Sequence, residues 1–220
     1  MRITLPSGTP AELVKPSSGT ASVGLVIIPD IMGLGPLFTD MATRLAEAEG
    51  WAVCAFEPFA GREHLELAER LRSVSELDDE TIIEDAVAAA DATECLQVGV
   101  LGFCLGGMYT LKASGTGRFT AAVSFYGMIH VPEQWRCPTQ GDPLAAAQVE
   151  GACPLLAVVG TEDQWTPERD VAELEAGGAT VVRYEGADHG FVHDPARPAH
   201  RPADAADAWE RALAFLTKAV

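Results

Sequence analysis

Basic residues are scarce in this chain of 220 amino acids. Lysine and arginine together number 15, against 32 aspartates and glutamates, so the formal net charge is −17 at pH 7. Nucleic acid and anionic membrane surfaces repel such a chain, and we expect neither as a partner. A small anionic substrate stays compatible with this charge, because one local arginine can outweigh the global field. The simplest consequence of the charge is solubility.

Paired cysteine spacings are also missing. The five cysteines are odd in number and include no Cys-x-x-Cys, which argues against a disulfide framework and against a zinc site. Neither a metal-ligand cluster nor a phosphate-binding glycine loop is present, so we expect no metal and no cofactor. Cys54 and Cys95 lie in apolar surroundings typical of inert core thiols. A bridge between Cys137 and Cys153 stays open at this point.

No apolar run reaches the length of a membrane helix, and the N-terminus lacks the basic segment and apolar run of a signal peptide. We therefore expect a cytoplasmic protein. The length and the hydrophobic share of 48% suit one globular domain, predicted to span 1–220.

Apolar runs alternate with amphipathic stretches along the chain. The predicted strands cover 23–29, 51–56, 98–101, 119–126, 155–160 and 180–184. The predicted helices cover 38–49, 62–77, 79–92, 108–113 and 204–219. This alternation predicts an α/β fold, with a mostly parallel sheet and helices on both faces. Segment 128–153 is long and rich in proline and polar residues, which is typical of a lid or binding loop.

The most informative motif is Gly102-Phe103-Cys104-Leu105-Gly106-Gly107, between a predicted strand and a predicted helix. A strand, a nucleophile flanked by glycines and a helix form the nucleophile elbow of the α/β-hydrolase fold. Only small neighbours let the strand and the helix approach so closely around a strained central residue. Here the central residue is Cys104, which favours a thiol hydrolase.

An acid and a base follow in the order that this fold requires. Asp163 comes directly after the predicted strand 155–160, and His189 comes after the strand that ends at Tyr184. The histidine would take the thiol proton, and the carboxylate would fix its tautomer and stabilise the imidazolium. Glu162 and Asp188 are neighbouring alternatives for the acid.

Each of these residues also has a structural interpretation. Cys104 could be a buried residue of a tight turn, Asp163 a turn former and His189 a loop histidine. Their order, each after the correct strand, favours the catalytic interpretation.

The chain resembles the dienelactone hydrolase family over nearly its whole length. The resemblance rests on five segments: Pro29–Leu34, Gly102–Gly107, Ser124–Gly127, Gly160–Pro167 and Ala187–Phe191. It implies an α/β-hydrolase fold and a triad of Cys104, Asp163 and His189. It also implies an oxyanion hole made by the backbone amides of Ile31 and Leu105.

Two departures from the family pattern concern thiol activation and substrate binding. Asp30 stands where the family has a glutamate thought to hold and activate the thiol; alternatively, Asp30 braces its loop. His193 stands where the family has one of two arginines that hold a substrate carboxylate. Arg70 and Arg72 are approximate matches to the other, and histidine lacks the guanidinium fork that a bidentate clamp needs.

Tyr126 and Trp165 fall on aromatic pocket positions of the family, or they only pack the core. Together these features predict a hydrolase that cleaves a small ester or lactone, such as a dienelactone, through a cysteinyl acyl-enzyme. Two alternatives stay open: a carboxylesterase or thioesterase acting on other acyl substrates, and a catalytically silent binding module. We expect a small-molecule substrate and a monomer or small homo-oligomer.

Overall fold

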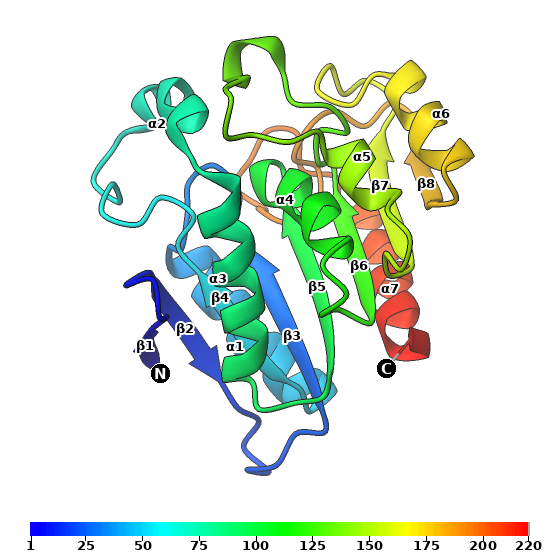
Figure 1. Ribbon diagram of the computed structural model, residues 1–220. Helices are drawn as coiled ribbons and strands as arrows, with labels where there is room; N and C mark the ends of the chain where they lie inside the picture. Colours follow the sequence, from blue (N-terminus) through cyan, green and yellow to red (C-terminus); the bar gives the residue numbers. More distant parts are fainter. Residues whose placement is uncertain (220) are drawn as a thin grey trace.

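The computed structural model describes residues 1–219, which form an eight-stranded sheet (Figure 1). The predicted domain boundary at 220 thus lies one residue outside the described part. The strands are β1 (Arg2–Thr4), β2 (Pro10–Val14), β3 (Val23–Ile28), β4 (Ala52–Phe56), β5 (Gln97–Phe103), β6 (Ala121–Phe125), β7 (Leu155–Gly160) and β8 (Thr180–Tyr184). Their order in the sheet is β1-β2-β4-β3-β5-β6-β7-β8. The β1–β2 and β2–β4 pairs are antiparallel and the other pairs are parallel, which confirms the predicted fold class.

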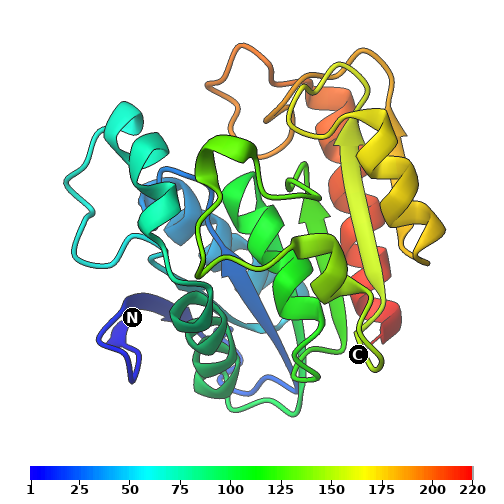
Figure 2. The same cartoon turned by 45° about the horizontal axis from the view of Figure 1, so that its top comes forward.

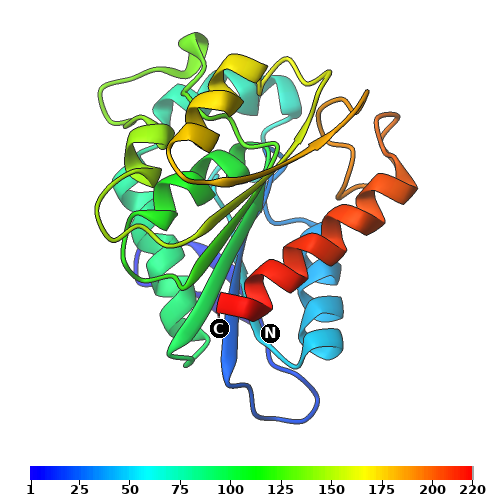
Figure 3. The ribbon, with the colours of Figure 1, turned by 90° about the vertical axis from the view of Figure 1, so that its right-hand side faces the viewer.

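Helices cover both faces of this sheet. They are α1 (Pro36–Glu49), α2 (Leu67–Ser73), α3 (Asp79–Ala92), α4 (Leu105–Ser114), α5 (Pro143–Ala147), α6 (Glu168–Ala176) and α7 (Pro202–Ala219), with 3₁₀ turns η1 (Val74–Glu76) and η2 (Glu133–Trp135). α1 and α7 pack on one face, and α3 and α4 pack on the other (Figure 3). Because both faces are covered, the central strands are continuous apolar runs, and every residue of β4, β6 and β7 is buried.

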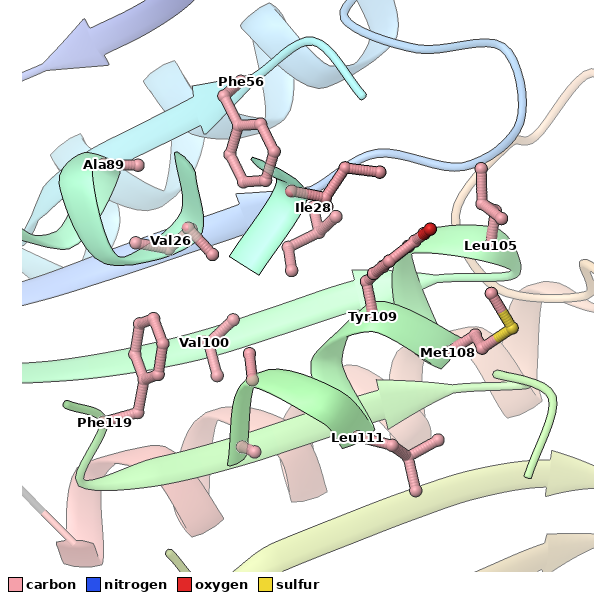
Figure 4. Packing of buried hydrophobic residues seen from close by; sticks show 14 of the residues in the cluster. Val26, Ile28, Phe56, Ala89, Val100, Leu105, Met108, Tyr109, Leu111 and Phe119 are labelled. Carbon is pink, nitrogen blue, oxygen red and sulfur yellow. The ribbon is translucent and has the colours of Figure 1, made fainter. Parts of the chain in front are cut away.

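α4 is the most deeply buried helix beside the sheet. All of its residues are buried, and Met108, Tyr109 and Leu111 belong to the same apolar cluster as Val26 and Val100 of the sheet (Figure 4). A helix surrounded by apolar contacts cannot shift easily, because protein interiors are close-packed. Its N-terminus is therefore a fixed point next to the end of β5.

The carboxyl ends of the parallel strands meet at one edge of the sheet, which Figure 2 turns toward the viewer. The segments that follow five of these six strands each carry a predicted site residue, β4 being the exception. Asp30 follows β3, Cys104 follows β5, Tyr126 follows β6, Asp163 follows β7 and His189 follows β8. The topology thus brings together residues that are far apart in the sequence.

Several predicted boundaries were wrong. The helix predicted over 62–77 is only α2 followed by η1, because Glu66 and Glu69 form a capping box that starts the helix at Leu67. The strand predicted over 119–126 ends at Phe125, since Tyr126 has a positive φ of 41°. The elbow strand and helix extend beyond the predicted 98–101 and 108–113.

Other elements were not predicted at all. β1 and β2 are short, and α6 follows Pro167, which ends the preceding turn. Segment 128–153 is not a plain loop, since it contains η2 and also α5, whose N-cap Asp142 accepts a hydrogen bond from the Ala145 amide at 3.0 Å. Cys137 and Cys153 are both free thiols, so the bridge between them is not formed.

Candidate active site

Cys104 lies at the turn between β5 and α4 in a strained backbone conformation. Its φ is 55° and its ψ is −116°. The Cys104 amide donates to the carbonyl of Phe125 at 3.0 Å, and its carbonyl accepts from the Met108 amide at 3.0 Å. A Cβ on Gly106 would lie 2.0 Å from the carbonyl oxygen of Ile28, so only glycine fits there. This is the geometry of a nucleophile elbow.

His189 is hydrogen-bonded to a buried carboxylate. Its Nδ1 lies 2.8 Å from Oδ2 of Asp163, whose side chain is fully buried. The other carboxylate oxygen of Asp163 accepts from the Trp165 amide at 2.8 Å. Asp163 is therefore anchored on its own turn and fixes the orientation of the imidazole.

Cys104 is the other titratable neighbour of His189 beside Asp163. Nε2 is buried and has no hydrogen-bond partner within residues 1–219. Burial alone would lower the pKa of His189, but the hydrogen bond to Asp163 and the neighbouring Cys104 thiolate raise this pKa to about 10. The site therefore favours a charged imidazolium beside the sulfur.

The two alternative acids have other positions. Glu162 is exposed on the turn, and its amide donates to the carbonyl of Ala187 at 3.0 Å. Asp188 is also exposed, and its carboxylate accepts from the His189 amide at 2.7 Å. Asp163 is the carboxylate that contacts the ring of His189.

Two backbone amides are candidates for the oxyanion hole. Those of Ile31 and Leu105 have no acceptor in the part of the chain that the structure describes. Leu105 is the first residue of α4, where amides lack an intrahelical partner and the helix dipole is positive. Ile31 is held in a turn in which the Gly33 amide donates to the carbonyl of Asp30 at 2.9 Å. Both amides can therefore donate a hydrogen bond to an incoming oxyanion.

A cleft of about 680 Å³ opens beside His189. Its walls come from 130–136, which follows β6, from 164–170, which follows β7, and from Asp188 and His189. Trp165 lines the cleft and stacks on Trp135, with ring centroids 5.1 Å apart. The lining thus combines one aromatic wall with exposed polar side chains.

Tyr126 and His193 do not line this cleft. Tyr126 is fully buried; its ring lies edge-on to the ring of His189, with centroids 5.2 Å apart, and its hydroxyl bonds to Nδ1 of His193. His193 Nε2 lies 3.0 Å from Oδ2 of Asp30, and the same oxygen accepts from Arg197. Asp30 has no hydrogen bond to Cys104 within residues 1–219, so the contact that the family glutamate makes is not formed.

The two arginines considered as carboxylate ligands lie elsewhere. Arg70 is buried over the ring of Phe59, and one of its nitrogens lies 3.6 Å from Glu57. Arg72 borders a separate surface hollow on α2. Neither lines the cleft at His189.

Three residues around the site were not predicted from the sequence. Arg197 pairs with Asp30, and its place eight residues after His189 gave no local signal. Glu57 is buried and accepts from the amides of Leu34 and Phe59, both at 2.8 Å, which fixes the turn after β3. Its place directly after the strand 51–56 was the only available signal. His130 lines the cleft and bridges two carboxylates.

Within residues 1–219 no cluster of three or more His, Cys, Asp or Glu side chains could hold a metal ion. The helices of the same part are all too short or too polar to cross a membrane.

A model of the dienelactone hydrolase family matches residues 10–220, and the chain belongs to this family. The chain is 28% identical over 226 residues to a carboxymethylenebutenolidase of Rhodococcus opacus, covering 97% of this chain and 88% of that protein. It is also 28% identical over 223 residues to a probable 2-oxo-3-(5-oxofuran-2-ylidene)propanoate lactonase of a Bradyrhizobium species, covering 94% and 88%.

The fold is shared with solved structures. A protein from Klebsiella pneumoniae subsp. pneumoniae, described as a putative dienelactone hydrolase, superposes with a TM-score of 0.86 at 24% identity over 99% of this chain and 97% of the other. Family membership indicates a hydrolase that acts on esters or lactones.

Proposed function

We propose that this hydrolase cleaves a small ester or lactone through a covalent acyl-enzyme on Cys104. The observation that carries the proposal is the combination of an elbow cysteine with a half-buried His189, which is bonded to the buried Asp163 and whose second ring nitrogen has no other partner within residues 1–219. Nucleophile, base and orienting acid in this arrangement are the requirements for acyl transfer.

In the first half-reaction the Cys104 thiolate attacks the substrate carbonyl carbon and forms a C–S bond. The carbonyl π electrons move to oxygen, where the Ile31 and Leu105 amides donate to the developing charge; one such donor is worth about 3 kcal/mol. The ester C–O bond then breaks, and the imidazolium of His189 gives its Nε2 proton to the leaving oxygen. With a lactone, this oxygen stays attached to the acyl chain.

In the second half-reaction neutral His189 takes a proton from water, and the resulting hydroxide attacks the thioester. Collapse of the tetrahedral intermediate breaks the C–S bond and releases the carboxylic acid. The thiolate and the imidazolium are thereby restored. Asp163 stays ionised throughout and keeps Nδ1 of His189 protonated.

The cleft suggests how a substrate is selected. Arg136 lines it and donates through Nε to the carbonyl of Val131 at 3.2 Å, without a carboxylate partner within residues 1–219. Arg169 also lines it but is paired with Asp170 at 2.9 Å. A carboxylated lactone such as a dienelactone would meet Arg136 rather than His193, and neutral esters should compete with it.

A panel of lactones, aryl esters and thioesters tests this proposal. Cys104→Ala should abolish turnover of the preferred substrate and His189→Ala should cost nearly as much, because triad members act as a unit. Cys153→Ala removes a half-buried thiol outside the cleft and serves as the matched control. Cys104→Ala with wild-type activity would contradict the mechanism.

The same panel separates the alternatives. A thioesterase or general carboxylesterase would prefer open-chain acyl substrates over lactones. A silent binding module would turn over no substrate, although its cleft could still bind one. We also propose that the protein is cytoplasmic and that it is a monomer or a small homo-oligomer.

A further inference from the structure

Four polar side chains form a continuous hydrogen-bonded row beneath the candidate active site. The hydroxyl of Tyr126 bonds to Nδ1 of His193, Nε2 of His193 lies 3.0 Å from Oδ2 of Asp30, and Arg197 donates to the same oxygen. The other oxygen of Asp30 accepts from the Met32 amide at 2.9 Å. The catalytic steps proposed above use none of these side chains.

The row has one consistent arrangement of protons. Burial lowers the pKa of His193, so this ring is neutral; its Nε2–H donates to Asp30 and its Nδ1 accepts from the Tyr126 hydroxyl. Burial alone would raise the pKa of Asp30, but the bond from His193 and the nearby positive charge of Arg197 hold it below its usual value. Each donor thus has an acceptor, as a buried polar row requires.

Apolar rings enclose His193, the middle of the row. The ring of His193 stacks on Phe103 at 4.8 Å and on Phe38 at 5.8 Å between centroids, and its side chain has no exposed surface. Phe103 directly precedes Cys104 in the chain. Because His193 is enclosed and both of its ring nitrogens are hydrogen-bonded, it has no free nitrogen that could bind a substrate carboxylate.

The row joins the three segments that build the site. Asp30 and Met32 flank Ile31, whose amide has no acceptor within residues 1–219, and Tyr126 follows Phe125, whose carbonyl accepts from the Cys104 amide. Arg197 crosses the glycine that follows His189: a Cβ on Gly190 would lie only 2.8 Å from one of its guanidinium nitrogens. These contacts connect the loop after β3 both to the segment beside Cys104 and to the segment that carries His189.

We propose that Tyr126, His193, Asp30 and Arg197 act together as positioning residues that set the Ile31 amide at the oxyanion site. This inference rests on the proposed acyl-enzyme mechanism and adds to it. It also assigns Asp30 and His193 to loop geometry, in place of thiol activation or substrate binding. A displacement of about 1 Å at such a donor can cost 10²-fold in rate, so a fixed row of this kind has catalytic value.

Tyr126→Phe and Arg197→Gln test the proposal. Each of these substitutions removes the hydrogen bond at one end of the row. Asp30→Asn and Asp30→Ala form a graded pair, because only asparagine keeps an acceptor for the Met32 amide. Arg201→Gln is the matched control: it lies on the same loop but bonds to the carbonyl of Glu185 and to Asp204, away from Asp30.

Two assays are run on each variant: turnover of a neutral aryl ester and its carboxylated counterpart, and alkylation of Cys104 by iodoacetamide. Alkylation needs the thiolate but no oxyanion hole. We expect Tyr126→Phe and Arg197→Gln to lower kcat about 10- to 100-fold for both esters, with KM and the alkylation rate within about twofold of wild type. Asp30→Ala should lose more than Asp30→Asn, and Arg197→Lys should recover part of the rate.

Three outcomes would overturn the proposal. An alkylation rate that falls in parallel with kcat would assign the row to thiol activation. A rise in KM for the carboxylated ester alone would assign it to substrate binding. An unchanged kcat would show that the row has no role in catalysis. Thermal unfolding identifies a variant that fails to fold. In that case Arg197→Gln decides, because the Arg197 side chain is partly exposed and tolerates replacement. Failure of the acyl-enzyme mechanism itself is seen separately, as activity of Cys104→Ala.

Discussion

At the scale of single residues, the candidate site depends on how three side chains divide their contacts. Cys104 takes a backbone conformation with φ 55° that places its sulfur at the N-terminus of α4. His189 uses one nitrogen for Asp163 and keeps the other for the sulfur. The helix N-terminus and the charged imidazolium of His189 both place positive charge beside Cys104, as the proposed attack requires.

The titration of His189 is the first prediction. In wild type, NMR of the imidazole protons should show protonated His189 far above the ordinary pKa of 6.5, with a folded value of about 10. Cys104→Ser removes the thiolate that helps to raise this pKa, so the value should fall, and Asp163→Asn should lower it further. A titration near 6.5 in all three proteins would contradict the charged pair.

This shift also sets the sign of a stability effect. A pKa raised above the unfolded value means that the folded state binds the proton more tightly. The stabilisation by His189 should be fully present below about pH 6.5. It should be lost as the pH rises through about 10.

The three residues of the proposed triad could be singled out from the sequence because each follows a recognisable strand within a few residues. Asp30 and His193 were also noticed, but as exceptions to a family pattern, and their partnership could not be predicted. They are 163 residues apart in sequence, and their contact depends on a loop whose path contains no regular element. Arg197 was missed for the same reason.

At the scale of elements, the close crossing of α4 over the end of β5 decides the shape of the site. A Cβ on Gly102 would lie 2.2 Å from the Gly106 carbonyl oxygen, and one on Gly106 would lie 2.0 Å from that of Ile28. Both obstacles are backbone atoms, which cannot move aside by a change of rotamer. The elbow glycines therefore hold strand, helix and the loop after β3 in one arrangement.

Gly106→Ala should consequently destabilise the protein by about 2 kcal/mol or more, in the range of overpacked cores. Urea denaturation of Gly106→Ala and of a matched Gly35→Ala variant measures the difference. Gly35 has a φ of −104° and nothing within 4 Å of an added Cβ, so its replacement should change stability little. Equal effects of the two substitutions would show that the close crossing is not a constraint.

The elements that could be predicted are those with long apolar runs, such as β5 and β7. β1 is three residues long and alternates exposed with half-buried positions, which gives no such run. The helix expected over 62–77 was too long because its apolar spacing continues through residues that a side-chain capping box excludes from the helix. Capping and turns involve only a few neighbouring residues. They therefore set helix boundaries that hydrophobic periodicity does not indicate.

At the scale of the whole molecule, the segments after β6 and after β7 are joined across the cleft. His130 places Nδ1 2.8 Å from Asp142, the N-cap of α5, and Nε2 3.1 Å from Glu173 of α6. Burial opposes the charge on this ring, but the hydrogen bonds to the two carboxylates together raise the pKa of His130 above its usual value. One side chain therefore ties two walls of the cleft together when it is protonated.

This tie should depend on pH in a defined direction. Because the folded pKa is raised, the stabilisation is complete below about pH 6.5 and is lost as the pH rises through the raised value. His130→Gln should reduce the free energy of unfolding more at pH 5.5 than at pH 9, by about 1 kcal/mol or less, since partly exposed pairs are weak. Chemical denaturation at both pH values measures this, with His64→Gln as the control; a loss that is larger at pH 9 would contradict the account.

The proposed activity of the whole molecule depends on one claim, that acyl transfer passes through Cys104. The most direct test is rapid acid quenching during turnover of an aryl ester, followed by intact mass measurement and peptide mapping. We expect a mass increase of one acyl group on the peptide that carries Cys104, sensitive to neutral hydroxylamine as a thioester is, and absent from Cys104→Ala. An acyl group on another residue, or steady turnover by Cys104→Ala, would contradict the claim.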